Sequence, residues 1–188
     1  MRKYDKEKDE RIKQSVIEAT NEIGVVSLTT AKIAKEANVS PATLYLRYEN
    51  KEDLISRIYE EVKADLHDGL NDVIDEEMPL TEQIRQMIKY SIKRTKQFPK
   101  ETNFIRQVMS NPALLDEHAQ HFVSKRDDVV SLLLERLDAS DDFSYPNRTS
   151  VETLLGFPAQ VFEQNPNQSE EISDELATMV ISAIYKGE

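Results

Sequence analysis

The chain of 188 residues contains no cysteine, no tryptophan and only four glycines. Without cysteine it forms no disulfide bond and has no thiol nucleophile. No apolar run reaches the ~18 residues of a membrane helix, and no apolar stretch follows Met1, so we expect neither a membrane span nor a signal peptide. These absences predict a cytoplasmic protein.

Charge and helical periodicity are what the chain has in quantity. Charged residues make up 31% of the sequence, and apolar residues recur at helical spacing almost from end to end. The sequence has no glycine-rich phosphate loop and no nucleophile elbow. We therefore predict an all-α fold of about nine helices, without catalytic residues, cofactor or metal.

The stretch from 27 to 54 carries the start and stop signals of three successive helices. Thr29 and Ser40 are favoured N-cap residues, and Ser40 is followed by a proline, which suits the first position of a helix. Asn38 lies between the first two helices and tolerates the left-handed conformation with which helices commonly end. Asn50 caps the third helix. Two short helices that cross over a third form a helix-turn-helix.

The second of these helices is only about two turns long and presents small and polar side chains outward. Hydroxyl groups can bond phosphates or bases, small apolar groups can touch a thymine methyl, and arginine pairs with phosphate. The pattern therefore favours DNA binding, with a plain helical hairpin as the alternative interpretation. The outward residues are Pro41, Ala42, Thr43, Tyr45 and Arg47.

Four short motifs resemble the DNA-binding domain of the tetracycline-repressor (TetR) family. They are Thr-Thr-x-x-Ile-Ala at 29–34, Asn-Val-Ser at 38–40, Ala-Thr-Leu-Tyr at 42–45 and Asn-Lys-Glu-x-Leu at 50–54. The sequence departs from the family pattern in having Ala31 in place of a frequent base-reading arginine, Asn38 in place of a frequent glycine, and Thr20 in place of a bulky apolar residue. The resemblance covers about the first third of the chain.

The resemblance implies a set of DNA contacts. Phosphate contacts are expected from Thr29 or Thr30, Thr43, Tyr45, Arg47 and Lys51, and base-edge contacts from positions 31 and 41–43. The predicted DNA-binding residues are Thr29, Thr30, Ala31, Ser40, Pro41, Ala42, Thr43, Tyr45, Arg47 and Lys51.

The net charge of −11 is unusual for a protein that binds DNA, but it is unevenly distributed. Residues 1–53 contain ten basic and ten acidic side chains, so the whole excess of acid lies in the rest of the chain. A neutral head with a local basic surface is compatible with DNA binding. We predict a helix-turn-helix DNA-binding domain over 1–54 and a helical effector-binding and dimerisation domain over 55–188.

Beyond the head, apolar spacing predicts a long helix that starts at Lys51 and continues to Val73, a mechanical link between the two domains. Pro158 is expected to kink its helix or start a new turn. Further helices are predicted at 7–23, 81–97, 102–109, 116–137, 149–162 and 172–184.

The last two predicted helices offer more apolar surface than a terminal hairpin buries by itself. The resemblance implies that this pair joins its symmetry mate in a four-helix bundle, and two heads on a two-fold axis can read a pseudo-palindrome. Burial against the chain's own body is the alternative. The predicted dimer face comprises Leu154, Leu155, Val161, Phe162, Leu176, Met179, Val180 and Ile184.

Methionine and aromatic residues in the middle helices suit an adaptable apolar pocket, although core packing is the simpler explanation of each one. The resemblance implies a small hydrophobic or amphipathic effector that releases a repressor from its operator. The predicted effector contacts are Met87, Tyr90, Phe104, Met109 and Phe122.

Two other classes of protein compete with a regulator. One is an all-α protein-interaction adaptor whose helix-turn-helix no longer binds DNA. The other is a metal-dependent enzyme centred on His118 and His121, which lie three residues apart on a predicted helix. A solvated helix surface explains the two histidines better, because no third ligand is evident in the sequence.

Overall fold

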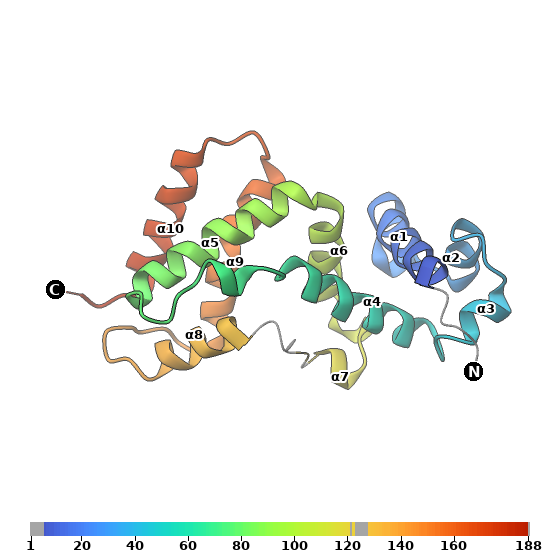
Figure 1. The fold of residues 1–188 in the computed structure, drawn as a ribbon, viewed down its shortest axis with the longest axis horizontal. Coiled ribbons are helices and arrows are strands. Elements are labelled where there is room, and N and C mark those ends of the chain that lie inside the picture. The colour runs from blue at the N-terminus through green and yellow to red at the C-terminus, as the bar shows by residue number, and fades with distance from the viewer. Residues whose placement is uncertain (1–5, 121, 123–127, 188) are drawn as a thin grey trace. The chain divides into compact units, whose positions relative to one another are not determined.

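The computed structural model describes residues 6–120, 122 and 128–187. Within these residues there are ten α-helices, three short 3-10 helices and no strand (Figure 1). The predicted all-α fold is confirmed. The chain divides into two compact units, the first formed by Met1–Lys63 with Lys100–Phe122 and the second by Ala64–Pro99 with Val123–Glu188.

The first unit packs the helix-turn-helix against a long N-terminal helix. Its fully buried side chains include Ile12 and Val16 from the first helix, Ile33, Leu44, Ile58 and Phe104. Thr20 is also completely buried, and its hydroxyl donates to the Val16 carbonyl oxygen at 2.7 Å, which satisfies the polar group. The helices of this unit are α1 (Lys6–Ile23), α2 (Thr30–Glu36), α3 (Pro41–Tyr45), α4 (Lys51–Leu66), α6 (Pro99–Met109) and α7 (Glu117–Gln120), with 3-10 turns η1 (Val25–Ser27) and η3 (Pro112–Leu114).

Polar contacts fix α6 against the end of α1. The Gln107 side-chain oxygen accepts a hydrogen bond from the Val25 amide at 2.9 Å. The Asn21 side-chain amide donates to the Lys100 carbonyl oxygen at 3.1 Å. Both contacts join segments about 80 residues apart, so α6 is part of the first unit although it lies far from the head in sequence.

The second unit is built around α5. Figure 1 shows α5 running beside α9 and α10. Ile84, Ile88 and Ile92 on α5 are at most 4% exposed and belong to one apolar core with residues from α8, α9 and α10. The elements of this unit are η2 (Leu70–Asp72), α5 (Leu80–Gln97), α8 (Asp128–Asp138), α9 (Arg148–Gln164) and α10 (Glu170–Ile184).

The predicted continuation of α4 to Val73 is wrong. The helix ends at Leu66, and Gly69 follows with φ 92°, in the left-handed region. Arg94 on α5 donates to the carbonyl oxygen of Leu66 at 3.1 Å, which satisfies an acceptor at the end of the helix. Apolar spacing did not reveal this end, because Leu70 is buried beyond the turn as it would be on a continuing helix.

Several other helix boundaries differ from those predicted. α5 begins at Leu80 with Pro79 as its N-cap residue, and α6 begins at Pro99, since proline suits a first helical position. The helix expected over 116–137 corresponds to α7 and α8, and residues 121 and 123–127 between them lie outside the described residues. α9 continues through Pro158 as a helix. No described helix is long and apolar enough to cross a membrane.

Candidate nucleic-acid interface

The turn of the helix-turn-helix is held by the predicted capping residues. The Thr29 hydroxyl accepts from the Lys32 amide at 3.2 Å, and the Ser40 hydroxyl accepts from the Thr43 amide at 3.0 Å. Asn38 has φ 52°, the only positive φ among the described non-glycine residues. Arg11 of α1 donates to the Ala37 carbonyl oxygen at 3.1 Å and secures the turn against α1.

Hydroxyl groups link the outward surfaces of α2 and α3. The Thr30 and Tyr45 hydroxyls are 3.0 Å apart, with either one able to donate. The Ser40 and Thr43 hydroxyls are 2.9 Å apart in the same way. Tyr45 is 55% exposed despite this contact. These two ordered pairs of hydroxyls, none of them buried, are suited to accept or donate hydrogen bonds along a phosphate backbone.

The structure brings the ten predicted DNA-binding residues together in the first unit, and none of them is buried. Both cations among them are engaged within the protein. The Arg47 guanidinium forms an ion pair with Asp9 of α1, and the Lys51 ammonium donates to the Val26 carbonyl oxygen at 3.0 Å. Their phosphate contacts remain predictions. To contact a phosphate, Arg47 either breaks its ion pair with Asp9 or binds the phosphate while it keeps that ion pair.

Sequence reasoning missed two exposed apolar residues of the first unit. Leu46, directly after α3, is 74% exposed, and Val26 in η1 is 62% exposed. Leu46 is the most exposed of the large apolar side chains in the described part of the chain. The signal was present in the sequence, because Leu46 is two residues from the buried Leu44 and so points to the other side of the helix.

These features define an all-α helix-turn-helix protein. Residues 17–58 match a model of the family described as "Bacterial regulatory proteins, tetR family". Among curated proteins, an uncharacterised helix-turn-helix-type transcriptional regulator of Haemophilus influenzae is 39% identical over 66 residues, 35% of each chain. The nucleoid occlusion factor SlmA of Vibrio cholerae is 29% identical over 118 residues, which cover 62% of this chain and 55% of SlmA. The chain thus matches about a third to about half the length of these relatives.

The likeness of fold extends over nearly the whole chain. A TetR-family transcription regulator from Marinobacter aquaeolei has a TM-score of 0.79 at 22% identity, covering 98% of this chain and 99% of that one. One from Haemophilus influenzae has a TM-score of 0.76 at 23% identity, covering 98% and 100%. The resemblance predicted from the sequence is confirmed: residues 17–58 match the TetR family model, and the chain has the fold of TetR-family regulators.

The five predicted effector contacts do not share one compact unit. Met87 and Tyr90 lie on α5 in the second unit, whereas Phe104, Met109 and Phe122 belong to the first. Met87 is 6% exposed and Phe104 is completely buried, so both pack as core residues. Burial raises the pKa of the Tyr90 phenol, whose hydroxyl donates to the Asp68 carbonyl oxygen. Their role in effector binding stays a prediction.

The second unit has a cavity of about 370 Å³ between α5 and α10, and none of those five residues lines it. Lys89 forms an ion pair with Asp174 at 2.6 Å, a hydrogen bond that lowers the pKa of the carboxyl group. The Lys96 ammonium lies 4.6 Å from the centre of the Phe162 ring. The lining residues are Lys89, Ile92, Lys93, Lys96, Gln97, Glu170, Ser173 and Asp174.

The predicted dimer face divides into two groups. Leu155, Phe162, Val180 and Ile184 are at most 5% exposed and pack in the core of the second unit. These four side chains are therefore buried within one chain. This agrees, for these four, with the alternative in which the last two helices pack against the chain's own body. Met179 is 50% exposed, and the three half-buried residues are Leu154, Val161 and Leu176. Phe157 on α9, 40% exposed, was missed.

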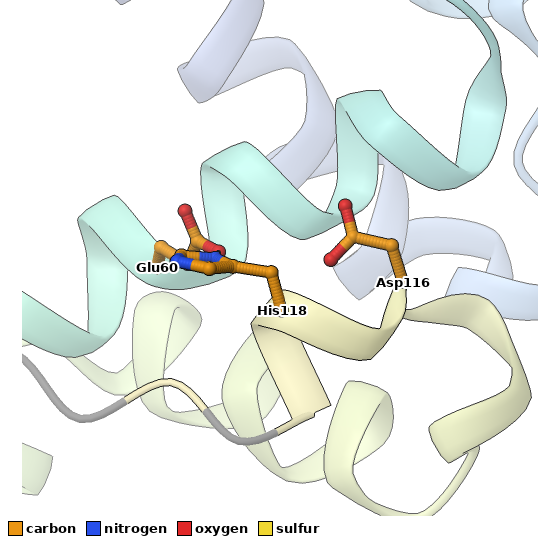
Figure 2. Close-up of side chains that lie close together, drawn as sticks. All are labelled: Glu60, Asp116 and His118. Atoms are coloured by element: carbon orange, nitrogen blue, oxygen red, sulfur yellow. The ribbon is translucent and has the colours of Figure 1, made fainter.

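One cluster in the first unit has the residue types of a metal site. Figure 2 shows Glu60 of α4 beside His118 of α7, with Asp116 nearby, and one potential ligand atom from each lies within 4.8 Å of the others. The cluster already holds a cation, because Arg57 donates to Glu60 at 2.7 Å and also to Asp116. His118 Nδ1 lies 2.7 Å from Glu60 Oε1. His121 lies outside the described residues.

The cluster joins the segment around α7 to one face of α4. The Asp116 amide donates to the hydroxyl of Ser56, and Lys63 donates to the Phe122 carbonyl oxygen, both at 2.9 Å. The hydrogen bond from the Ala119 amide, followed by the Arg57 guanidinium, holds the pKa of Asp116 below its usual range. The arrangement therefore has the character of a structural ion-pair network, in which Arg57 takes the place that a metal ion would need.

Proposed function

We propose that the protein is a DNA-binding transcriptional regulator that acts as a homodimer on a pseudo-palindromic operator. The observation that carries the proposal is the set of hydroxyls on the outside of α2 and α3. Thr30 and Tyr45 hold each other in place, and Ser40 holds Thr43. The family match over residues 17–58 supports DNA as the partner of this surface. Duplex DNA is recognised by such heads through phosphate contacts that set the position and base contacts that give specificity.

Dimerisation through α9 and α10 supplies the second head. Met179 and Phe157 are large, exposed apolar side chains on these two helices, and exposed apolar patches of this kind commonly mark protein interfaces. Two linked heads bind two half-sites at once, which raises the apparent affinity far above that of one head. The dimer face that we propose therefore uses Phe157 and Met179 with the half-buried Leu154, Val161 and Leu176.

We further propose that the regulator is a repressor and that a small hydrophobic or amphipathic effector releases it from DNA. An effector acts by binding the DNA-free conformation more tightly than the DNA-bound one, and it shifts the equilibrium only by that difference in affinity. The predicted contacts Met87, Tyr90, Phe104, Met109 and Phe122 are the positions at which we expect substitutions to change the effector response.

The test is selection of bound sequences from a random pool of duplex DNA by the purified full-length chain, carried out in parallel with Tyr45→Ala. The matched control is Tyr185→Ala, which removes a tyrosine of similar exposure (43%) in the second unit. We expect the unchanged chain and the control to enrich one pseudo-palindrome and Tyr45→Ala to lose it. Affinity for the selected site should fall steeply as salt is raised, because phosphate contacts release counterions.

Equal enrichment with Tyr45→Ala would refute the assignment of this surface. Absence of any enriched sequence at moderate salt would favour the adaptor, a protein-interaction module with a degenerate helix-turn-helix. That alternative predicts a partner that binds α9 and α10 in place of a second copy. Sedimentation of the unchanged chain and of Met179→Glu distinguishes the homodimer from the adaptor. Only a homodimer is converted to a monomer by the carboxylate that the substitution places on the dimer face.

A further inference from the structure

The outward face of α3 is apolar at its centre. Leu44 is 1% exposed and defines the inward direction of the helix. At 100° per residue, positions 42 and 46 both lie about 160° from Leu44 around the axis, and Leu46 keeps helical dihedral angles as the C-cap residue. Ala42 and Leu46 are both exposed. They therefore form an apolar stripe at the position from which a helix lying in the major groove reaches the bases.

The same face lacks the groups that read purines. Guanine is usually recognised by arginine or lysine and adenine by asparagine or glutamine, each through two hydrogen bonds. No residue from Ser40 to Leu46 carries a guanidinium, ammonium or amide side chain. Ala31 at the start of α2 does not supply one either. The two cations that follow α3 in the sequence, Arg47 and Lys51, are bonded to Asp9 and to the Val26 carbonyl oxygen.

The hydroxyls of α3 are placed beside this stripe and not on it. Thr43 and Tyr45 lie at about 100° from Leu44 on either side, where they bond Ser40 and Thr30. Their position flanks the groove-facing stripe and suits contacts with the sugar-phosphate backbone. The chemistry that the stripe itself offers to the bases is apolar contact, and the apolar group that the major groove displays is the 5-methyl group of thymine.

We propose that Ala42 and Leu46 recognise thymine methyl groups, so that T·A pairs at the centre of each half-site carry the sequence specificity of this protein. This inference rests on the proposed function, since it requires DNA to occupy the outward face of α3. Contact with DNA also removes from water the Leu46 side chain, which is 74% exposed in the free protein. Specificity then depends on the match between two apolar surfaces.

The experiment removes only the methyl groups. The DNA sequence selected by the full-length chain is resynthesised with deoxyuridine in place of one thymine at a time, which preserves base pairing and every hydrogen-bonding group. We expect substitution at a contacted thymine to weaken binding about fourfold, the ratio that corresponds to ~0.8 kcal/mol for one buried methyl group. Substitution outside the half-sites should have no effect.

The variants Leu46→Ala and Ala42→Gly test whether the apolar stripe is what senses the thymine methyl groups. In each variant, deoxyuridine at the thymine facing the altered residue should no longer weaken binding, whereas the effect at other thymines persists. Val73→Ala is the matched control, because Val73 is an exposed apolar residue (38%) that lies outside the helix-turn-helix and belongs to the second unit. Circular dichroism and thermal melting verify that the variants are folded.

The outcomes separate the inference from the proposed function. Deoxyuridine sensitivity that disappears in Leu46→Ala or Ala42→Gly supports the inference. A selected operator that binds equally well with every thymine replaced overturns the inference and leaves the DNA-binding function intact. Sensitivity that persists unchanged in both variants also overturns it, because the methyl groups are then read by other residues. Failure to select any sequence overturns the proposed function itself.

Discussion

The hydrogen bond between Ser56 and the Asp116 amide offers a sharp test of how the segment around α7 is held against α4. Ser56 is completely buried, and its hydroxyl oxygen accepts from the Asp116 amide at 2.9 Å. Ser56→Ala removes one oxygen atom and leaves a part-buried amide without its acceptor. Because alanine replaces serine with almost no change of shape, the loss of the hydrogen bond dominates the effect.

The expected size follows from two opposing contributions. An unsatisfied buried amide costs about 1–3 kcal/mol, and alanine regains roughly 0.5 kcal/mol through its better helix propensity. The net loss is therefore about 0.5–2.5 kcal/mol, and a value of 1.4 kcal/mol corresponds to about tenfold in an opening equilibrium. The rate of hydrogen exchange at the Asp116 amide should therefore rise about tenfold. The local readout avoids the assumption that two compact units unfold together.

Ser15→Ala is the matched control. Ser15 is 8% exposed on α1, and its hydroxyl makes no hydrogen bond to the other residues that the structure describes. The same substitution there should leave stability unchanged or raise it by up to ~0.5 kcal/mol through helix propensity. If Ser56→Ala proves as stable as Ser15→Ala in urea, and the Asp116 amide exchanges at its original rate, the reasoning is refuted.

Substitutions at three further residues test the turn and the ion-pair network. Asn38→Gly should stabilise the chain by roughly 0.5 kcal/mol because it relieves a positive φ, whereas Asn38→Val should destabilise it by more than ~1 kcal/mol; urea midpoints decide, and equal midpoints would exclude strain at this residue. Ser40→Ala should cost about 1 kcal/mol through the lost cap, measurable in the same titration. The pKa of Asp116 is lowered by the Ala119 amide and by Arg57, so its stabilisation is present above its usual pKa of about 3.8 and is lost as the pH falls through the lower folded value. The stability difference between the unchanged chain and Asp116→Asn should therefore narrow below about pH 4, and a constant difference would contradict this.

The head could be predicted closely because its structure is determined by local chemistry. Thr29 and Ser40 cap their helices as expected, and Asn38 adopts the left-handed conformation that its side chain tolerates. Each of these depends on contacts within a few residues, which are visible in a sequence. The exposed position of Leu46 was equally accessible, since it follows from helical spacing relative to Leu44.

The body could be predicted only in outline, because its boundaries depend on contacts between distant segments. The end of α4 is stabilised by Arg94, 28 residues away, and Gly69 alone is a weak signal in an otherwise periodic stretch. Apolar spacing also cannot distinguish a core face from a dimer face. Phe162 and Met179 are equally apolar in sequence, but the first is 1% exposed and the second 50%.

The outward face of α3 is separate from the residues that hold the head together. Its exposed side chains contribute little to the core, whereas Leu44, Ile33 and Ile58 form that core. Substitutions at Ala42 and Leu46 should therefore change what the surface prefers to bind without threatening the fold. In evolutionary terms, descendants of this chain can acquire new binding sites by single replacements, for example by an amide side chain at position 42, while the scaffold stays constant.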